Sequence, residues 1–263
     1  MKIFLLLLAP LFIFAKVHYA KVEPYDTVIL KSAVSGLIVD VDLKSEGTMV
    51  SSHMIIHIDD VLDKINLKDT KESTLLLNLM LKINQEIANS LIGTVKRQES
   101  YYNRITQLTT ASKTQKDNAY SSYISAKTQY LGTKEKIVSL KKQILDMKYK
   151  ISQLQDTLNK KSIILTNKYL YKLMVKKGDF VAPGSSLAQI QDTTSAKLTL
   201  FLEANELENI HEKIIYINNI KTKYKVNKIW KSADEKFISS YRVEIYIDTP
   251  KEVFSKLVKV EIK

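Results

Sequence analysis

The sequence contains no cysteine, and this absence excludes several kinds of site. Structural disulfides, thiolate metal centres, a thiol nucleophile and a lipid anchor on an N-terminal cysteine all require that residue. Glycine and proline are scarce too, with six and four residues among 263, so long loops are few. The composition therefore favours a protein built mainly of regular helices and strands.

The chain is strongly basic, because 40 Lys and Arg residues stand against 28 Asp and Glu residues and give a formal net charge of +12. Such an excess suits an acidic partner surface, for example anionic lipid, nucleic acid or an acidic protein. The lysines are spread along the chain and are not interleaved with aromatic residues, which argues against nucleic-acid binding. We expect a solvated basic surface that faces an anionic membrane.

The N-terminus carries a short apolar run, in which Lys2 precedes IFLLLLAPLFIFA at residues 3–15. This run has the length of a signal-peptide core and is too short to span a bilayer comfortably. We predict a signal peptide over residues 1–20, with cleavage after Ala15 or Ala20, and an uncleaved anchor as the alternative. In either case the body of the protein lies outside the cytoplasm.

Strand-like and helical regions alternate along the rest of the chain. Residues 21–60, 161–195 and 196–263 contain short apolar runs separated by turn residues, which predicts strands. Residues 61–160 contain no proline and only two glycines, Gly93 and Gly132, which predicts helix.

The helical region contains a heptad pattern. From residue 119 to residue 158 apolar or small residues recur at spacings of four and three, which predicts a coiled-coil seam. The preceding arm is less regular; Leu76, Met80, Ile83 and Ile87 lead its predicted seam, with a period nearer 3.6 than 3.5 residues. The predicted seam of the second arm includes Tyr123, Tyr130, Ile137, Leu140, Ile144, Ile151 and Leu154.

A reversal is expected between the two arms, within the sequence TTASKTQKD at residues 109–117. Ser112 or Thr114 could cap a second helix there. The two arms have equal lengths, so folding back gives an antiparallel hairpin with its tip at residues 105–117. One continuous helix that dimerises is the alternative.

The segments on either side of the helical region resemble each other. The first reads SGLIVDVDLKSEGTMVSSHMIIHIDD and the second NKYLYKLMVKKGDFVAPGSSLAQIQD. In both, a strand leads to a glycine, Gly47 or Gly178, and a valine follows three residues later, Val50 or Val181. The first copy has one extra residue before its glycine.

Two such half-motifs separated by a helical hairpin resemble the periplasmic adaptor, or membrane fusion protein, family with its HlyD-like members. The resemblance implies an elongated α+β protein. A split lipoyl-like (biotinyl-like) β-sandwich, residues 21–60 and 161–195, would hold an inserted antiparallel coiled-coil hairpin, residues 61–160. A small β-barrel at residues 196–263 would follow, and KLTLFLEANELENI at residues 197–210 looks like its first strand and short helix.

The same resemblance implies partners and a docking site. The tip would engage a TolC-like outer-membrane channel, through residues that match the family's tip pattern with a shortened turn. The barrel end would engage an inner-membrane transporter, of resistance-nodulation-division (RND) type or else an ABC exporter of a type I secretion system. Several copies would form a ring, a trimer or hexamer, in the periplasm at the inner membrane of a Gram-negative bacterium. A membrane-proximal domain is expected to be missing. The implied docking residues are Arg104, Leu108, Ser112 and Lys113.

Other chemistries find less support in the sequence. A biotin or lipoate carrier needs a modifiable lysine where the two half-motifs join, and helical residues occupy that junction. His53 and His57 lie four residues apart on a predicted strand, a separation of about 13 Å, too far to share one ion. We predict no enzyme activity, catalytic residue, cofactor or metal ligand. A structural coiled-coil protein of the envelope is the alternative from another class.

Overall fold

The computed structural model describes residues 16–250 and 254–263, which form two helices, eleven strands and two short 3-10 helices. The predicted signal-peptide core lies outside the described residues. In chain order the elements are β1 (Val17–Lys31), β2 (Gly36–Val41), η1 (Leu43–Ser45), β3 (Thr48–Ile58), α1 (Val61–Gln107), α2 (Lys113–Lys161), β4 (Ser162–Leu173), β5 (Phe180–Val181), β6 (Ser186–Glu203), η2 (Ala204–Leu207), β7 (Ile215–Ile217), β8 (Ile220–Lys221), β9 (Val226–Ala233), β10 (Ser240–Asp248) and β11 (Leu257–Ile262).

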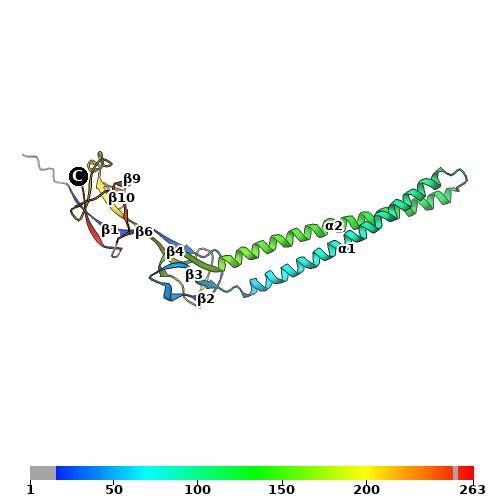
Figure 1. Ribbon diagram of the computed structural model, residues 1–263, viewed down its shortest axis with the longest axis horizontal. Coiled ribbons are helices and arrows are strands. Elements are labelled where there is room, and N and C mark those ends of the chain that lie inside the picture. The colour runs from blue at the N-terminus through cyan, green and yellow to red at the C-terminus, as the bar shows by residue number, and fades with distance from the viewer. Residues whose placement is uncertain (1–15, 251–253) are drawn as a thin grey trace, which may run out of the picture. The chain divides into compact units, whose positions relative to one another are not determined.

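The chain divides into two compact units. One unit is His57–Ile163, and the other combines the chain up to Ile56 with Ile164–Lys263. In the first unit α1 and α2 lie side by side and are joined by a short turn (Figure 1). Within the described residues, neither helix combines the length and the hydropathy that crossing a bilayer requires.

The two helices run antiparallel, as their contacts at both ends show. Near the turn, Tyr102 stacks on Tyr123 with ring centroids 6.1 Å apart. At the opposite end, the ammonium group of Lys161 pairs with the carboxylate of Asp63. Residues near the start of α2 therefore lie beside the end of α1, and residues near the end of α2 lie beside the start of α1. The chain folds back, instead of forming one continuous helix.

The two half-motifs of the strand unit exchange hydrogen bonds through their glycines. The N–H of Gly47 donates to the carbonyl of Leu170 at 2.8 Å, and the N–H of Gly178 donates to the carbonyl of Ile38 at 2.9 Å. Both glycines have positive φ, 77° and 95°, which L-residues with a side chain rarely adopt. Each half thus supplies the carbonyl group that accepts a hydrogen bond from the turn glycine of the other half.

Strand pairing extends this exchange. β2 pairs with β5, so that Gly36 lies opposite Val181 and Leu37 opposite Phe180. Val50 and Val181, the valines that follow the two glycines, are both buried. The repeat seen in the sequence therefore corresponds to two segments that pack together.

β1 and β6 are long strands that cross two of the predicted domain boundaries. β6 is one strand of 18 residues, so the predicted boundary between residues 195 and 196 falls inside it. β1 begins at Val17, so residues 17–20, predicted as the end of a signal peptide, are paired with β11. Ala20 lies opposite Val258 and is only 1% exposed. Neither boundary carries a glycine or a proline, so no local turn signal marks where these strands begin or end.

β1 and the strands from β6 onward form an open sheet around one apolar core. The pairings run in the order β9, β10, β6, β1, β11, β7 and β8. β7 and β8 contain only three and two residues. Within the described residues β8 is an edge strand that does not pair with β9, so the sheet does not close into the predicted barrel. The buried core of this region is Ala20, Val22, Ala196, Leu198, Leu200, Leu202, Ile210, Ile215, Val226, Val243, Ile245, Val258 and Val260.

An ion pair connects β4 to β6. The ammonium nitrogen of Lys168 lies 2.7 Å from Oδ2 of Asp192, and the N–H and hydroxyl of Thr194 donate to Oδ1 at 3.1 and 2.6 Å. The hydrogen bond from Lys168, followed by those from Thr194, lowers the pKa of Asp192 from 3.8 to about 2. The ionised carboxylate is therefore the form that the folded chain favours.

The glycine turns predict opposite effects for two glycine-to-alanine substitutions. Gly178→Ala forces a side chain into a left-handed conformation and should destabilise the strand unit by about 1–2 kcal/mol. Gly132→Ala is the control, because Gly132 lies in α2 with open space around it, and alanine there should stabilise the helix by about 1 kcal/mol. Trp230 fluorescence reports unfolding of the strand unit, and far-ultraviolet circular dichroism reports the helices. Equal effects of the two substitutions would contradict this role of Gly178.

The ion pair predicts a pH-dependent difference between wild type and Asp192→Asn. Because the pKa of Asp192 is lower in the folded chain, its contribution is complete above about pH 4 and disappears as the pH falls to about 2. The pair is partly exposed, so solvent screening limits the loss at neutral pH to about 1 kcal/mol. Urea unfolding at several pH values measures it, with Asp40→Asn on β2 as the control. A difference that persists unchanged at the lowest pH would contradict this account.

Candidate functional site

The turn of the hairpin is fixed by backbone caps. α1 ends at Gln107, and the N–H of Leu108 donates to the carbonyl of Ile105 at 3.2 Å. Ser112 is the N-cap of α2: its hydroxyl accepts from the N–H of Gln115 at 3.2 Å, and its own N–H donates to the side chain of Gln115 at 2.9 Å. This reciprocal pair is a capping box, which holds the reversal in one conformation. Of the two cap candidates from the sequence, Ser112 occupies the cap.

The four predicted docking residues all lie at this end of the hairpin. Arg104 is exposed in the last turn of α1, and Lys113 is exposed at the first position of α2. Leu108, between the helices, leaves 49% of its surface exposed. Arg104, Lys113 and Leu108 therefore expose two cations and an apolar side chain, while the hydroxyl of Ser112 is engaged in the cap.

A shallow hollow on α1 extends this basic surface away from the turn. It has a volume of about 730 Å³, and its cationic lining residues are Lys96, Arg97 and Arg104. Lys96 and Arg97 were not singled out from the sequence, although their spacing to Arg104 places all three on one side of a helix. The arrangement suits acidic side chains on a partner surface.

Three tyrosines pack across the two helices beside the tip. Tyr102 of α1 stacks on Tyr123 at 6.1 Å and contacts Tyr120 at a centroid distance of 5.4 Å. The hydroxyl of Tyr123 also donates to the carboxylate of Glu99 at 3.3 Å. These contacts join α1 to α2 close to the tip and restrict the movement of the two helix ends there.

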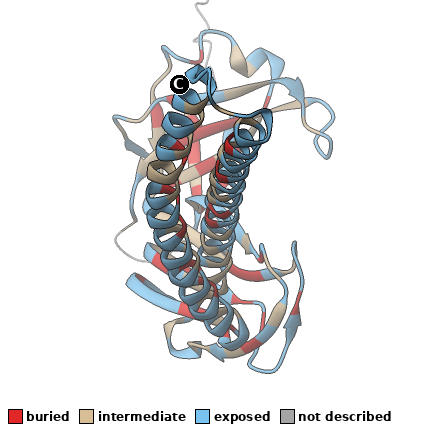
Figure 2. Ribbon diagram, turned by 90° about the vertical axis from the view of Figure 1, so that its right-hand side faces the viewer, coloured by how far each residue is buried: buried red, intermediate tan, exposed pale blue. Residues whose placement is uncertain are grey.

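None of the seam positions predicted for α2 is exposed. Leu140 and Ile144 are buried, and the other five are partly buried. Figure 2 shows buried segments at intervals along both helices, separated by exposed ones. The partly buried seam residues are Tyr123, Tyr130, Ile137, Ile151 and Leu154.

The seam predicted for the first half of α1 is wrong. Leu76, Met80, Ile83 and Ile87 are 64%, 43%, 47% and 44% exposed. The inner face instead follows an unbroken repeat of four and three residues that contains many polar side chains. Its members, all buried or partly buried, are Asp63, Leu67, Thr70, Thr74, Leu77, Leu81, Asn84, Ala88, Leu91, Val95, Gln98, Tyr102 and Ile105.

Polar residues can occupy that inner face because their hydrogen bonds are satisfied within α1. The hydroxyl of Thr70 donates to the carbonyl of Asn66 at 2.7 Å, and that of Thr74 donates to the carbonyl of Thr70 at 2.8 Å. The amide of Asn84 donates to the carbonyl of Met80 at 2.7 Å. A hydrophobic pattern alone cannot identify such a face, because its polar members need no partner on α2.

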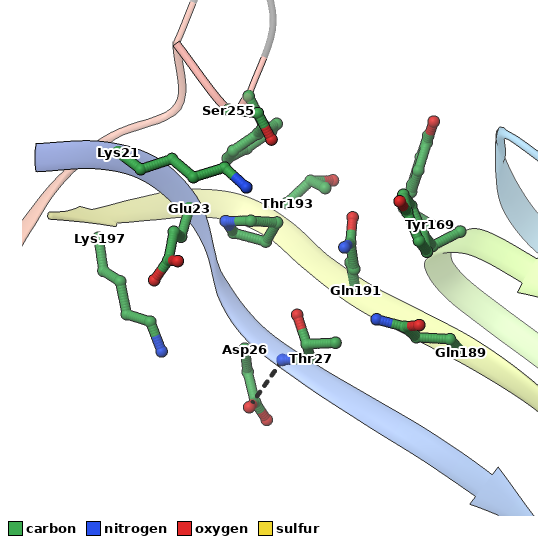
Figure 3. A pocket seen from close by; sticks show the side chains of 13 residues that line it. Lys21, Glu23, Asp26, Thr27, Tyr169, Gln189, Gln191, Thr193, Lys197 and Ser255 are labelled. Atoms are coloured by element: carbon green, nitrogen blue, oxygen red, sulfur yellow. Dashed lines mark hydrogen bonds between the residues drawn. The ribbon is translucent and has the colours of Figure 1, made fainter. Parts of the chain in front are cut away.

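A polar cavity of about 740 Å³ lies in the strand unit, beside the irregular pairing of β1 between Pro24 and Asp26. Figure 3 shows Gln189, Gln191 and Thr193 of β6 along this cavity, with Tyr169 of β4 at one end. Two lysines, Lys21 and Lys197, and two acids, Glu23 and Asp26, also line it, so its charges balance. The cavity offers hydrogen bonds to a polar group, and none of the predicted site residues lines it.

The two histidines of the first half-motif have separate partners. Nε2 of His53 lies 3.1 Å from the carboxylate of Asp42, and Nε2 of His57 lies 3.5 Å from that of Asp60. Among residues 16–250 and 254–263, no group of three or more His, Cys, Asp or Glu residues could hold a metal ion. The histidines thus belong to different local contacts.

Comparison with known proteins gives matches among solved structures. No protein-family model matches the chain, and neither does any curated protein. The crystal structure of MacA from Actinobacillus actinomycetemcomitans matches with a TM-score of 0.75 and 14% identity, over 94% of this chain and 78% of that chain.

Two further structures match over nearly the whole of this chain. A membrane fusion protein from Streptococcus pneumoniae R6 has a TM-score of 0.58 and 13% identity, over 95% of this chain and 99% of that one. A MacA–MexA chimera that contains the α-hairpin domain of Pseudomonas aeruginosa MexA has a TM-score of 0.55 and 14% identity, over 95% and 81%. These matches confirm the resemblance found in the sequence: the chain has the mixed helix-and-sheet fold of membrane fusion proteins.

Proposed function

We propose that this protein is the periplasmic adaptor of a tripartite efflux or export system, linking an inner-membrane transporter to a TolC-like outer-membrane channel. The observation that carries the proposal is the helical hairpin, inserted between two interlocked half-motifs and ending in an exposed tip. The tip binds the channel through the side chains of Arg104, Leu108 and Lys113, which are free of the capping hydrogen bonds. Coupling is mechanical, through packed surfaces, and uses no cofactor.

The transporter in this proposal is of the RND class. If a gene for an ABC exporter lay beside this gene, or if an ABC exporter cross-linked to the strand unit, the transporter would instead be that of a type I secretion system. The protein reaches the periplasm by its signal peptide, with cleavage after Ala15. Cleavage after Ala20 would remove the first residues of β1, including the buried Ala20 itself.

We further propose that copies of the chain assemble side by side through two apolar stripes on the hairpin. The stripe on α2 consists of Ile124, Leu131, Val138 and Leu145, which repeat every seven residues and are 37%, 54%, 65% and 65% exposed. The stripe on α1 consists of Leu76, Met80, Ile83 and Ile87, the exposed residues described above. A heptad repeat of exposed aliphatic residues is the pattern by which one helix packs along another.

The two stripes lie on opposite broad sides of the hairpin. Each member of the α2 stripe follows an inner residue by one position, as Val138 follows Ile137. On α1, Met80 and Ile87 precede the inner residues Leu81 and Ala88. Because the helices are antiparallel, positions that follow an inner residue lie on the same side of both helices, and positions that precede one lie on the other side. One copy can therefore contact two neighbours by different surfaces.

The stripes overlap in part along the hairpin. The facing pairs Tyr102–Tyr123 and Asp63–Lys161 place Val138 level with Ile87 and Leu145 level with Met80. The other two members of the α2 stripe lie nearer the tip than the α1 stripe. A neighbour that docks without an axial shift can therefore pair Val138 and Leu145 of one copy with the α1 stripe of the next. Contacts between two different surfaces close into a ring when the rotation between copies divides a full turn, which is compatible with the trimer or hexamer that the family resemblance implies.

The tip assignment predicts that Arg104→Asp abolishes channel binding. A negative charge replaces a cation that faces an acidic partner, so cross-linking to the channel should fall at least about tenfold. In a strain lacking the gene, this variant should fail to restore resistance to drugs, bile salts and metal ions. Lys142→Asp, the same charge change in the middle of α2, should behave as wild type. Unchanged cross-linking would contradict the tip assignment, and unchanged susceptibility after gene deletion would favour a structural envelope protein.

The stripes predict complementary defects in assembly. Val138→Asp with Leu145→Asp breaks one face, and Ile83→Asp with Ile87→Asp breaks the other. Each pair should raise the dissociation constant at least about a hundredfold, since charges replace buried aliphatic groups. Sedimentation velocity measures the assembly, and Tyr149→Asp, an exposed position outside both stripes, is the control.

Mixing the two broken variants separates this arrangement from a symmetric one. Each variant keeps one intact stripe, so the mixture should form a heterodimer and nothing larger. A mixture that stays monomeric would contradict contacts between the α1 stripe and the α2 stripe.

A further inference from the structure

The loop between β9 and β10 carries the most exposed large apolar side chain of the described residues. Ile238 is 83% exposed, and its neighbour Phe237 is 50% exposed. Nothing in the channel or ring contacts proposed above uses this loop. A pair of bulky apolar residues in water at the end of a hairpin is unfavourable unless another surface covers it.

The loop is held in one shape by hydrogen bonds. The N–H of Asp234 donates to the carbonyl of Ser240 at 2.9 Å, and the N–H of Ser240 donates to the carbonyl of Phe237 at 2.8 Å. The carboxylate of Asp234 accepts from the N–H groups of Lys236 and Phe237 at 2.9 and 3.2 Å. The exposure of Ile238 therefore belongs to an ordered turn.

The loop rests on an aromatic base. Phe237 packs against Phe201 of β6 with ring centroids 4.4 Å apart. Phe201, Phe237 and Trp230 of β9 line one hollow of about 450 Å³. Proteins that bind the interface of a bilayer often place aliphatic side chains among the lipids and tryptophan at the level of the headgroups. This loop has the same arrangement, with an aliphatic residue at its tip and a tryptophan behind it.

Cations surround this base. The ammonium group of Lys228 lies 4.3 Å from the ring centroid of Trp230, and the guanidinium carbon of Arg242 lies 4.5 Å from it. Arg242 is paired with the buried carboxylate of Glu244 at 2.8 Å, so the charge toward solvent comes from the three exposed lysines Lys228, Lys231 and Lys236 against the two acids Asp234 and Glu235. One of those acids, Asp234, is engaged with the loop backbone. The net positive charge is complementary to anionic lipid headgroups.

We propose that the β9–β10 loop docks on an anionic membrane surface, with Ile238 and Phe237 inserted between headgroups and the surrounding cations at the phosphates. This inference goes beyond the adaptor function and does not depend on it, because it needs neither a transporter nor a channel. It concerns how the strand unit contacts the lipid itself.

The single tryptophan of the chain makes a direct test with the unmodified protein. Vesicles of phosphatidylcholine and phosphatidylglycerol that contain brominated lipids should quench Trp230 and shift its emission to the blue. Vesicles of phosphatidylcholine alone should quench it much less, and high salt should weaken the effect. Because quenching reports only on lipid close to Trp230, vesicle binding through any other segment does not imitate it.

Two variants locate the contact. Ile238→Ser should raise the lipid concentration needed for half-maximal quenching about tenfold, since an aliphatic group no longer enters the interface. Leu75→Ser, which removes a 70% exposed leucine on α1, is the control and should leave quenching unchanged. Circular dichroism confirms that both variants fold.

A second probe uses the absence of native cysteine. A fluorophore sensitive to polarity, attached to Ile238→Cys, should shift to the blue on adding anionic vesicles, and one attached to Leu75→Cys should not. Vesicles that sediment the protein without changing Trp230 or the probe at position 238 would overturn the proposal, as would an unchanged Ile238→Ser variant. Cross-linking of position 238 to a transporter without quenching by lipid would assign the loop to a protein partner and would equally overturn it.

Discussion

The exchange of backbone hydrogen bonds between the two half-motifs is the constraint on which the rest of the structure depends. Gly47 donates to Leu170, and Gly178 donates to Ile38, across segments separated in sequence by the whole helical hairpin. The pairing requires that the chain return to its starting point after α2. A single long helix could not satisfy it, and neither could two arms of very different length. The nearly equal arms of the hairpin, of 47 and 49 residues, follow from this closure.

Much of this architecture can be predicted from local sequence signals. The shared pattern of glycine and valine in the two half-motifs reflects turns with positive φ at Gly47 and Gly178. The cap at Ser112 follows from the ordinary preference for serine at a helix start. Such signals work because each depends on a few neighbouring residues. The limits of β1 and β6 could not be found in this way, since a strand that passes from one partner strand to the next leaves no mark in its own sequence.

The error on α1 has a different physical origin. A seam is predicted by choosing the most apolar face of a helix, and α1 has an apolar face that does not point at α2. Leu76 and Ile83 lie outside, whereas Thr74 and Asn84 lie inside with their polar groups bonded to carbonyls of α1. A helix can carry two apolar or partly apolar faces, and its composition does not tell which of them packs against the other helix of the same chain. The exposed loop at Ile238 escaped notice for a similar reason, because one short apolar pair in a polar turn has no periodicity.

The polar inner face of α1 has a consequence for the cohesion of the hairpin. Threonine and asparagine that bond to their own helix contribute little attraction toward α2, so that part of the seam is held mainly by the residues contributed by α2. The aliphatic side chains that would strengthen it are turned outward, where only a neighbour can bury them. In the ring proposed above, a neighbour would bury these side chains and so stabilise each hairpin, and by mass action a copy diluted away from its neighbours would be less stable.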